Sequence, residues 1–174
     1  MGRQENVSTA GAIAVVTAGP PGAGKTSFLR EEGYLDSDYR NIDPDEVKSL
    51  LLHRALDEGT FNDLLDIPLS DGLSIQPMEL ATLVHQESAS IADSILRYCL
   101  EAGENVLLQG ALGWDEYPNI LLRALTKEDY STLTILDVEV EETLALERSR
   151  ERWWEGRHDP TDILGGRFVP EDVI

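Results

Sequence analysis

The segment that decides the fold is Gly19-Pro20-Pro21-Gly22-Ala23-Gly24-Lys25-Thr26-Ser27, near the start of a chain of 174 residues. It contains a glycine, four further residues and then Gly-Lys-Thr, which is the spacing of a phosphate-binding loop. The apolar run AIAVVTA at residues 12–18 lies directly before it and is typical of a buried parallel strand. A helix is predicted at residues 26–32, so the segment has the strand–loop–helix context in which this pattern binds phosphates.

Phosphate binding explains why this loop contains glycines, a lysine and a hydroxyl residue. Glycines let the backbone bend so that successive N–H groups point inward, and the positive end of the following helix adds to the attraction for anions. Lys25 is expected to reach the terminal phosphates, and Thr26 to place its hydroxyl on Mg²⁺. We therefore predict that ATP and Mg²⁺ bind at residues 19–27. The alternative is a glycine-rich turn that only joins a strand to a helix.

The rest of the chain alternates predicted strands and helices. Strands are expected at residues 39–42, 105–109 and 133–138, and helices from residue 44 and at residues 78–101, 120–125 and 143–155. This order predicts an α/β fold with a mostly parallel sheet flanked by helices on both faces. Residues 57–77 are expected to form an irregular excursion beside the binding site. Residues 1–10 are expected to be a flexible N-terminus and residues 11–174 a single domain.

The composition excludes some partners. Acidic residues outnumber Lys and Arg by 33 to 14, a formal net charge of −19, which repels nucleic acids and anionic membrane surfaces. The acidity serves either solubility or a basic protein partner. Cys99 is the single cysteine, so no internal disulfide can form, and we expect a buried thiol in a helix. No signal peptide and no apolar run of about 18 residues is present, so we expect the cytoplasm.

Positive charge gathers near the C-terminus, in Arg148, Arg150, Arg152, Arg157 and Arg167. Arg148 and Arg152 are four residues apart on a predicted helix and share one of its faces. Such arginines can close over a nucleotide and neutralise charge that develops on a transferring phosphoryl group. The alternative is a solvated helix flank that pairs with Glu147, Glu151 and Glu155.

Two carboxylates are candidates for binding and deprotonating an acceptor hydroxyl. Asp43 follows a predicted strand at the carboxyl edge of the sheet, where it serves as a base, as a helix N-cap, or as both. Glu87 falls in the apolar stripe Leu80, Val84, Glu87, Ile91 and Ile95, so we expect it on the buried face of its helix. A buried carboxylate indicates either a site or an ion pair with one of the arginines. The three histidines, His53, His85 and His158, lack the spacing of a metal cluster.

Six segments together resemble one family over residues 15–174. They are GPPGAGKTSF, NIDPDEVK, HQESASIADSIL, NVLLQGALGW, LERSRERWWEGR and LGGRFVPEDVI. The family is that of the zeta toxins, P-loop kinases of toxin–antitoxin systems. The resemblance implies that ATP phosphorylates the 3′-hydroxyl of UDP-N-acetylglucosamine, with another small sugar or nucleotide metabolite as the next candidate, and that an antitoxin protein is a partner.

The resemblance also implies roles for individual residues. Asp43 would be the base on the sugar hydroxyl and Glu87 an acid of the substrate site. Lys25, Arg167 and either Arg148 or Arg152 would act on the phosphates.

The chain departs from the family's pattern in two places. Gln109 stands where relatives usually have Asp or Glu, and the chain stops at residue 174, where relatives usually continue with further helix. These departures favour a competing class, a non-catalytic ATP-binding module that regulates a partner. A polynucleotide 5′-kinase is disfavoured by the negative charge.

Overall fold

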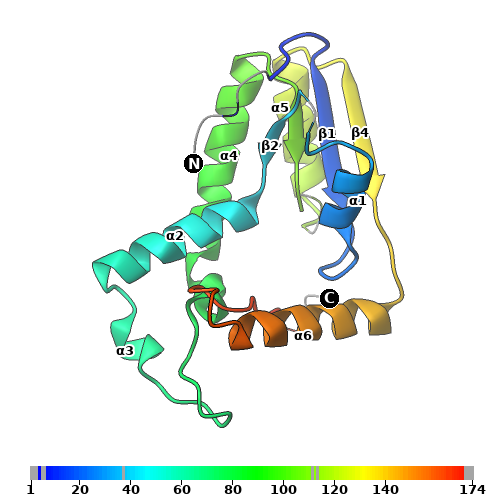
Figure 1. Ribbon diagram of the computed structural model, residues 1–174. Helices are drawn as coiled ribbons and strands as arrows, with labels where there is room; N and C mark the ends of the chain where they lie inside the picture. Colours follow the sequence, from blue (N-terminus) through cyan, green and yellow to red (C-terminus); the bar gives the residue numbers. More distant parts are fainter. Residues whose placement is uncertain (1–3, 5–6, 37, 111, 113, 171–174) are drawn as a thin grey trace.

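A four-stranded parallel sheet forms the centre of the molecule (Figure 1). The structure, a computed structural model, describes residues 4, 7–36, 38–110, 112 and 114–170. The strands in these ranges are β1 (Ile13–Ala18), β2 (Arg40–Ile42), β3 (Val106–Leu108) and β4 (Thr132–Asp137). Their order is β2-β3-β1-β4, and every pairing is parallel. The predicted α/β fold is therefore confirmed.

Helices cover both faces of this sheet (Figure 1). They are α1 (Lys25–Glu31), α2 (Pro44–Glu58), α3 (Asn62–Leu65), the 3₁₀ helix η1 (Pro77–Val84), α4 (His85–Glu101), α5 (Tyr117–Lys127) and α6 (Glu142–His158). Successive strand residues point to opposite faces, so Val16 packs with α4 and α5 whereas Val15 packs with Leu29 of α1. Cys99 is buried in α4 as predicted, and burial raises the pKa of its thiol to about 11.

The longest predicted helix and the last predicted helix differ from the structure. The helix predicted at residues 78–101 is instead η1 followed by α4, because Pro77 opens a tighter 3₁₀ segment before the α-helix begins. The excursion at residues 57–77 is irregular as expected, apart from the short α3. The helix predicted to end at Gly156 continues to His158. Gly156 does not cap this helix but permits a backbone contact, since a Cβ there would lie 2.6 Å from the Cα of Gly166.

The N-terminal segment, expected to be flexible, is attached to the sheet at Ser8. The Ser8 N–H donates to the carbonyl of Asp38 at 2.8 Å, and the Ser8 carbonyl accepts from the N–H of Asn105 at 2.7 Å. Residues 1–3, 5 and 6 of that prediction lie outside the described residues. Residue 8 thus extends the sheet contacts of β2 and β3.

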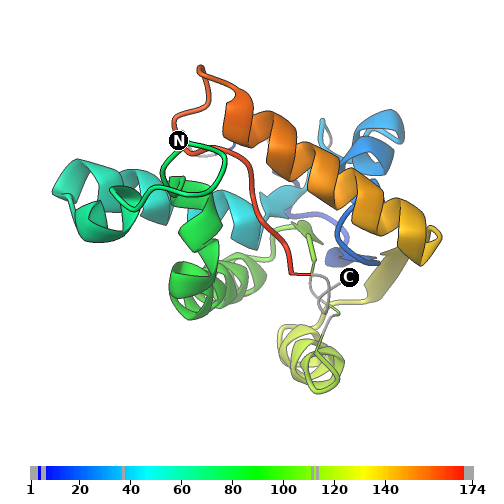
Figure 2. The same cartoon turned by 90° about the horizontal axis from the view of Figure 1, so that it is seen from below.

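Helix α6 lies across the end of the sheet where the strands finish (Figures 1 and 2). Buried Arg157 near its C-terminus donates to Asp71 at 2.6 and 2.9 Å and to Glu79 at 2.7 Å. Glu79 also accepts from the indole Nε1 of Trp153 at 2.8 Å. Hydrogen bonding to Arg157 lowers the pKa of Asp71 to about 2. These contacts fasten the excursion and η1 to α6.

The segment after α6 returns along the same helix. The carbonyl of Leu164 accepts from the N–H of Met78 at 2.8 Å, and the Leu164 side chain packs with Leu52 of α2. Gly166 then lies directly on α6, where a Cβ would be 1.8 Å from the carbonyl oxygen of Trp153. Only a residue without a side chain fits at this crossing.

We expect Gly166→Ala to destabilise the protein by about 3 kcal/mol or more, because an added methyl group would have to push two backbones apart. Chemical denaturation monitored by circular dichroism measures this loss. The control is Gly33→Ala, where a Cβ meets nothing within 4 Å and only the positive φ of 74° adds strain. Its expected cost is about 1 kcal/mol. Equal costs for the two variants would show that the crossing tolerates a side chain.

Candidate functional site

The glycine-rich loop joins β1 to α1, as predicted. Gly19, Gly22 and Gly24 have φ angles of 114°, 82° and 94°, a region that L side chains rarely adopt. A Cβ on Gly19 would also lie 2.1 Å from the carbonyl oxygen of Val138. Pro20 and Pro21 are half-buried and Ala23 is buried. The glycines therefore fix the backbone of a curved loop directly before a helix.

The start of α1 presents polar groups for an anion. Lys25, Thr26 and Ser27 form its first turn, where backbone N–H groups have no partner within the helix. Thr26 and Ser27 are exposed. An exposed hydroxyl beside a phosphate-binding lysine suits Mg²⁺, which binds proteins through few groups and keeps phosphate oxygens as ligands. The loop therefore fits ATP with Mg²⁺. Within the described ranges, no group of three or more His, Cys, Asp or Glu side chains could hold a metal ion.

Lys25 folds back over its own loop. Its Nζ donates to the carbonyls of Gly19 at 2.7 Å and Pro20 at 2.9 Å. Burial lowers the pKa of this amine, and the charges of Arg152 and Arg167 lower it further. Asp45 and Asp43 oppose this shift. Side chains from the loop, α2, α6 and the C-terminal segment are thus close enough to influence one another's charge.

Asp43 stands where β2 ends and α2 begins. Its Oδ1 accepts from the N–H of Asp45 at 2.9 Å, so it is the helix N-cap that the sequence offered as one alternative. Burial raises the pKa of Asp43, and the neighbouring charge of Asp45 raises it further. The backbone hydrogen bond from Asp45 and the charges of Arg167 and Lys48 act in the opposite direction. The carboxyl group is therefore more basic than an ordinary aspartate.

Asp45 and Lys48 belong to the same cluster. Lys48 donates to Asp45 at 2.9 Å, and Arg167 forms an ion pair with the other carboxylate oxygen of Asp45. Burial acts to raise the pKa of Asp45, but these two cations outweigh it and the pKa lies below its ordinary value. The sequence analysis did not single out Asp45. The three-residue spacing of Asp45 and buried Lys48 within one helix was the signal that could have found the pair.

Two arginines of α6 lie on the face that the spacing predicted. Desolvation lowers the pKa of Arg152, the charge of Arg167 lowers it further, and Asp45 opposes both. Arg152 is therefore part of the cluster. Arg148 lies beside the loop, since a Cβ on Gly24 would be 3.9 Å from its Nη1. The structure thus brings Arg148, Arg152 and Arg167 to the phosphate loop.

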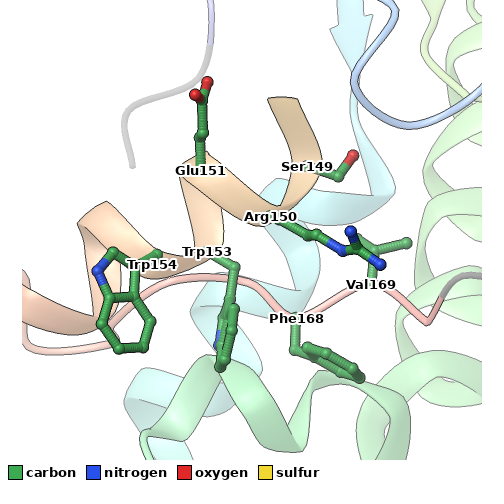
Figure 3. Close-up of a pocket in the computed structure, with 7 residues that line it drawn as sticks. All are labelled: Ser149, Arg150, Glu151, Trp153, Trp154, Phe168 and Val169. Carbon is green, nitrogen blue, oxygen red and sulfur yellow. The ribbon is translucent and has the colours of Figure 1, made fainter. Parts of the chain in front are cut away.

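The remaining arginines of the C-terminal group lie elsewhere. Arg157 is buried in the ion pairs that hold the excursion to α6, so it is a structural residue. Arg150 points toward Val169 on another side of α6 (Figure 3). Of the five arginines near the C-terminus, Arg148, Arg152 and Arg167 therefore lie near the loop, and their action on phosphates stays a prediction.

The prediction that Glu87 lies on a buried helix face is wrong. Glu87 is exposed, and the buried residues of α4 are Ser88, Ala92, Leu96, Cys99 and Leu100. The predicted stripe lies one residue away from the buried face, on which Val84, Ser88, Ala92 and Leu96 keep a four-residue spacing across the junction of η1 and α4. The small side chains of Ser88 and Ala92 gave a weaker apolar signal than Ile91 and Ile95, so the prediction followed the wrong positions. The pKa of exposed Arg54 is raised chiefly by its hydrogen bond to Glu58, and the charge of Glu87 adds slightly to that increase.

Two further side chains border the cluster. The residue His85 is exposed as a whole. Partial burial nevertheless lowers its pKa, and the charges of Lys48 and Arg167 lower it further. Sequence reasoning set it aside because its spacing to the other histidines carried no information. Gln109 is buried after β3 and donates to Asn41 Oδ1 at 2.8 Å. The Gln109 amide thus has a structural partner in Asn41.

The parallel sheet, the glycine-rich loop between β1 and α1 and the cations beside that loop define a P-loop domain, a fold whose loop suits the phosphates of a nucleotide. The chain belongs to the zeta toxin family, which matches residues 2–174. No helix in the described part of the chain is both long and apolar enough to span a bilayer.

Two solved structures share this fold. One comes from the characterisation of the PezAT chromosomal toxin–antitoxin system of Streptococcus pneumoniae, with a TM-score of 0.63 and 19% identity over 92% of this chain and 60% of that chain. The other is from a Pnkp1/Rnl/Hen1 complex, with a TM-score of 0.50 and 12% identity over 90% of this chain and 46% of that chain. These likenesses support the fold alone.

A curated relative is similar in sequence. The calmodulin calcium-dependent NAD kinase of Arabidopsis thaliana is 26% identical over 165 residues. That match covers 88% of this chain but 27% of the plant protein. The chain thus spans about a quarter of that relative's length.

We expect Lys25→Met to weaken binding of Mg²⁺-ATP about 10- to 100-fold, because it removes charged hydrogen bonds to the terminal phosphates. Isothermal titration calorimetry measures the loss. Lys127→Met is the control, since this exposed lysine at the end of α5 forms its ion pair with neighbouring Glu128. An unchanged ATP affinity of Lys25→Met would show that this loop does not bind the terminal phosphates.

Proposed function

We propose that the protein transfers the γ-phosphate of ATP to a hydroxyl group of a small acceptor. The observation that carries this proposal is the convergence of Lys25, Arg152 and Arg167 with the basic carboxylate of Asp43. Phosphoryl transfer needs cations for the phosphates and a base for the acceptor, and both lie at the carboxyl end of the sheet. Membership in the zeta toxin family supports the same chemistry.

The phosphate side uses the loop and three arginines. The first-turn amides of α1 bind phosphate oxygens, and Lys25 exchanges its two carbonyl partners for the terminal phosphates. Arg148, Arg152 and Arg167 neutralise charge on the transferring group. The Thr26 hydroxyl would hold the Mg²⁺ that accompanies ATP, and the ion would supply neutralising charge for the phosphates.

On the acceptor side, Asp43 orients the hydroxyl and takes its proton. Only Oδ1 of this carboxylate serves the helix cap in the described contacts, so Oδ2 is free to face an acceptor. The raised pKa of Asp43 brings its basicity closer to neutral pH, which suits a general base. Glu87, exposed in the first turn of α4, contacts a distal part of the acceptor.

The leading acceptor is UDP-N-acetylglucosamine, phosphorylated at its 3′-hydroxyl, as the family resemblance implies. NAD is the second candidate, because a relative with 26% identity is named as an NAD kinase. In both molecules a diphosphate joins two sugars, of which at least one carries a base. The competing class, a non-catalytic ATP-binding module, is favoured by Gln109, whose amide cannot support a metal as a carboxylate would.

We also propose a protein antitoxin as a partner. The structural neighbour from Streptococcus pneumoniae was studied as part of a toxin–antitoxin system. The net charge of −19 favours a basic surface on such a partner over a nucleic acid. A cytoplasmic location is consistent with this role.

We expect Asp43→Asn to lower kcat about 10²- to 10⁴-fold while leaving stability nearly unchanged, because Asn is an equally good N-cap but a poor base. In the wild type, burial raises the pKa of Asp43, so activity should fall as pH decreases through a value above the ordinary aspartate range. A kinase assay across pH 4 to 9, with thermal unfolding as the control, tests both points. Full activity in Asp43→Asn would eliminate this residue as the base.

The acceptor is tested by incubating the protein with Mg²⁺-ATP and each candidate separately. We expect mass spectrometry to detect a product heavier by one phosphate group with UDP-N-acetylglucosamine, and none in the Lys25→Met control. A phosphorylated product with NAD alone would replace the leading acceptor by the second. Tight ATP binding with no product from a panel of nucleotide sugars and dinucleotides would favour the non-catalytic class.

A further inference from the structure

Asp45 binds one cation with each of its carboxylate oxygens. Its Oδ1 accepts a hydrogen bond from the Nζ of Lys48 at 2.9 Å, and its Oδ2 pairs with the guanidinium group of Arg167. Lys48 belongs to the same helix, α2, whereas Arg167 comes from the segment after α6, which lies beside α2 (Figure 1). Asp45 therefore joins α2 to the C-terminal segment through charge.

The proposed base, Asp43, is a second carboxylate that both of these cations influence. Burial raises the pKa of Asp43, and the charges of Arg167 and Lys48 act against that increase. Oδ1 of Asp43 accepts from the N–H of Asp45 at 2.9 Å, so Oδ2 is the oxygen left for an acceptor. A lysine or arginine bonded to Oδ2 would occupy the place of the acceptor hydroxyl and would make Asp43 a weaker base.

Asp45 stands on the phosphate side of Asp43. Burial lowers the pKa of Lys25 in the loop, and Asp45 opposes that shift more strongly than Asp43 does. Burial also lowers the pKa of Arg152 on α6, and Asp45 again opposes the shift. An arginine paired with Asp45 is thus kept on the phosphate side, in agreement with the role of Arg167 in the proposed function.

The buried ammonium group of Lys48 needs an anionic partner. Only 8% of the Lys48 side chain is exposed, whereas 47% of the Asp45 side chain is exposed. A buried charge without a partner is costly, so Lys48 would turn to another carboxylate if Asp45 were neutral. Asp43 is a carboxylate that the charge of Lys48 already reaches. Loss of the Asp45 charge would therefore direct Lys48 towards the base.

We propose that Asp45 is a positioning residue: it holds Lys48 and Arg167, one on each carboxylate oxygen, and so keeps both cations off the base Asp43. The proposal rests on the proposed function only in naming Asp43 as the base. With the cations held elsewhere, Oδ2 of Asp43 is open to the acceptor hydroxyl and retains its affinity for a proton. Asp45 needs to touch no reacting atom, because its effect passes through Asp43.

Charged groups from the loop, α2 and the C-terminal segment surround Asp43. Those that interact electrostatically with it are, in chain order, Lys25, Asp45, Glu46, Lys48 and Arg167. His85 at the start of α4 and Arg152 of α6 interact with Asp45 and Arg167. Since His85 can titrate in the same pH range, each titration is repeated in the presence of His85→Gln.

The test measures the pKa of Asp43 directly, from the NMR chemical shift of its carboxyl carbon as pH is varied. The signal is assigned by its absence in Asp43→Asn, and neither ATP nor an acceptor is present. We expect Asp45→Asn to lower this pKa by about 0.5 to 1 pH unit, because a negative neighbour is lost and two cations lose their partner beside Asp43. Lys48→Met should raise the pKa by a similar amount, since a positive charge is lost while Asp45 keeps Arg167.

The double variant Asp45→Asn/Lys48→Met removes one charge of each sign. It should return the pKa of Asp43 most of the way to the wild-type value. The matched control is Asp57→Asn, which removes the same charge from an exposed position in the last turn of α2. Asp57 lies about 18 Å from Asp45 along the helix axis, beyond the screening length of about 8 Å at physiological salt. It should leave the pKa of Asp43 unchanged.

Kinase assays across pH connect this arrangement to the reaction. The acid limb of kcat/KM for the acceptor should move to lower pH in Asp45→Asn and to higher pH in Lys48→Met, because the base acts only when it is deprotonated. A purely structural role for Asp45 would lower thermal stability without moving this limb in opposite directions. Thermal unfolding of each variant is measured in parallel.

Three results would overturn the proposal. One is an Asp43 pKa that does not change in either Asp45→Asn or Lys48→Met. Another is a shift of the same sign in these two variants, which would indicate a folding effect. The third is an acid limb that stays fixed while the carboxyl pKa moves. If Asp45→Asn folds poorly, Lys48→Met and the double variant test the same arrangement, since neither contains the unpaired Lys48 ammonium group.

Failure of the proposed function has a different signature. The NMR titrations contain no substrate, so the expected shifts can be observed in a protein that transfers no phosphate. That result would remove Asp43 as a base and keep Asp45 as the residue that holds Lys48 and Arg167. Phosphate transfer with an Asp43 pKa that is insensitive to both substitutions would keep the function and remove the positioning role.

Discussion

The close approach of Gly166 to the carbonyl of Trp153 is the constraint on which the site depends. With no side chain between the two backbones, the returning segment lies directly on α6 and its direction is fixed. Side chains in an extended segment alternate between its two sides, so the two residues after Gly166 point to different neighbours. Arg167 pairs with Asp45 near the phosphate loop, and Phe168 packs on Trp153. One backbone contact thus positions both a phosphate-side cation and an aromatic wall.

Positive charge is retained at one place in a strongly acidic protein. Burial lowers the pKa of both Lys25 and Arg152, and the charge of Arg167 lowers both further, whereas Asp45 opposes the effect on each. Asp45 pairs with both Lys48 and Arg167 and so balances cations that would otherwise repel each other. A polyphosphate would take over part of that role. The cluster therefore keeps positive charge near the phosphate loop of a protein whose net charge is strongly negative.

Sequence patterns were sufficient where the local chain alone decides the geometry. The positive φ angles of the loop glycines, the N-cap of Asp43 and the shared helix face of Arg148 and Arg152 follow from spacings of a few residues. Patterns failed where geometry depends on distant contacts. A count of apolar residues favoured the stripe of Glu87, Ile91 and Ile95, whereas the face of α4 that packs on the rest of the molecule carries Ser88, Ala92 and Leu96. The burial of Arg157 depends on Asp71 and Glu79, more than seventy residues away in the chain. No local pattern could show that pairing.

The folded-back position of Lys25 sets a threshold for what can enter the loop. Its ammonium group already has two carbonyl partners, at 2.7 and 2.9 Å. A monovalent ion such as chloride would have to replace two hydrogen bonds with one weak contact, which leaves little net gain. A polyphosphate offers several charged oxygens at once. The Lys25 ammonium group therefore gains electrostatic energy when it leaves the two carbonyls for these oxygens. Selectivity against common cellular salts is therefore a property of Lys25 and the loop backbone themselves and does not depend on the arginines.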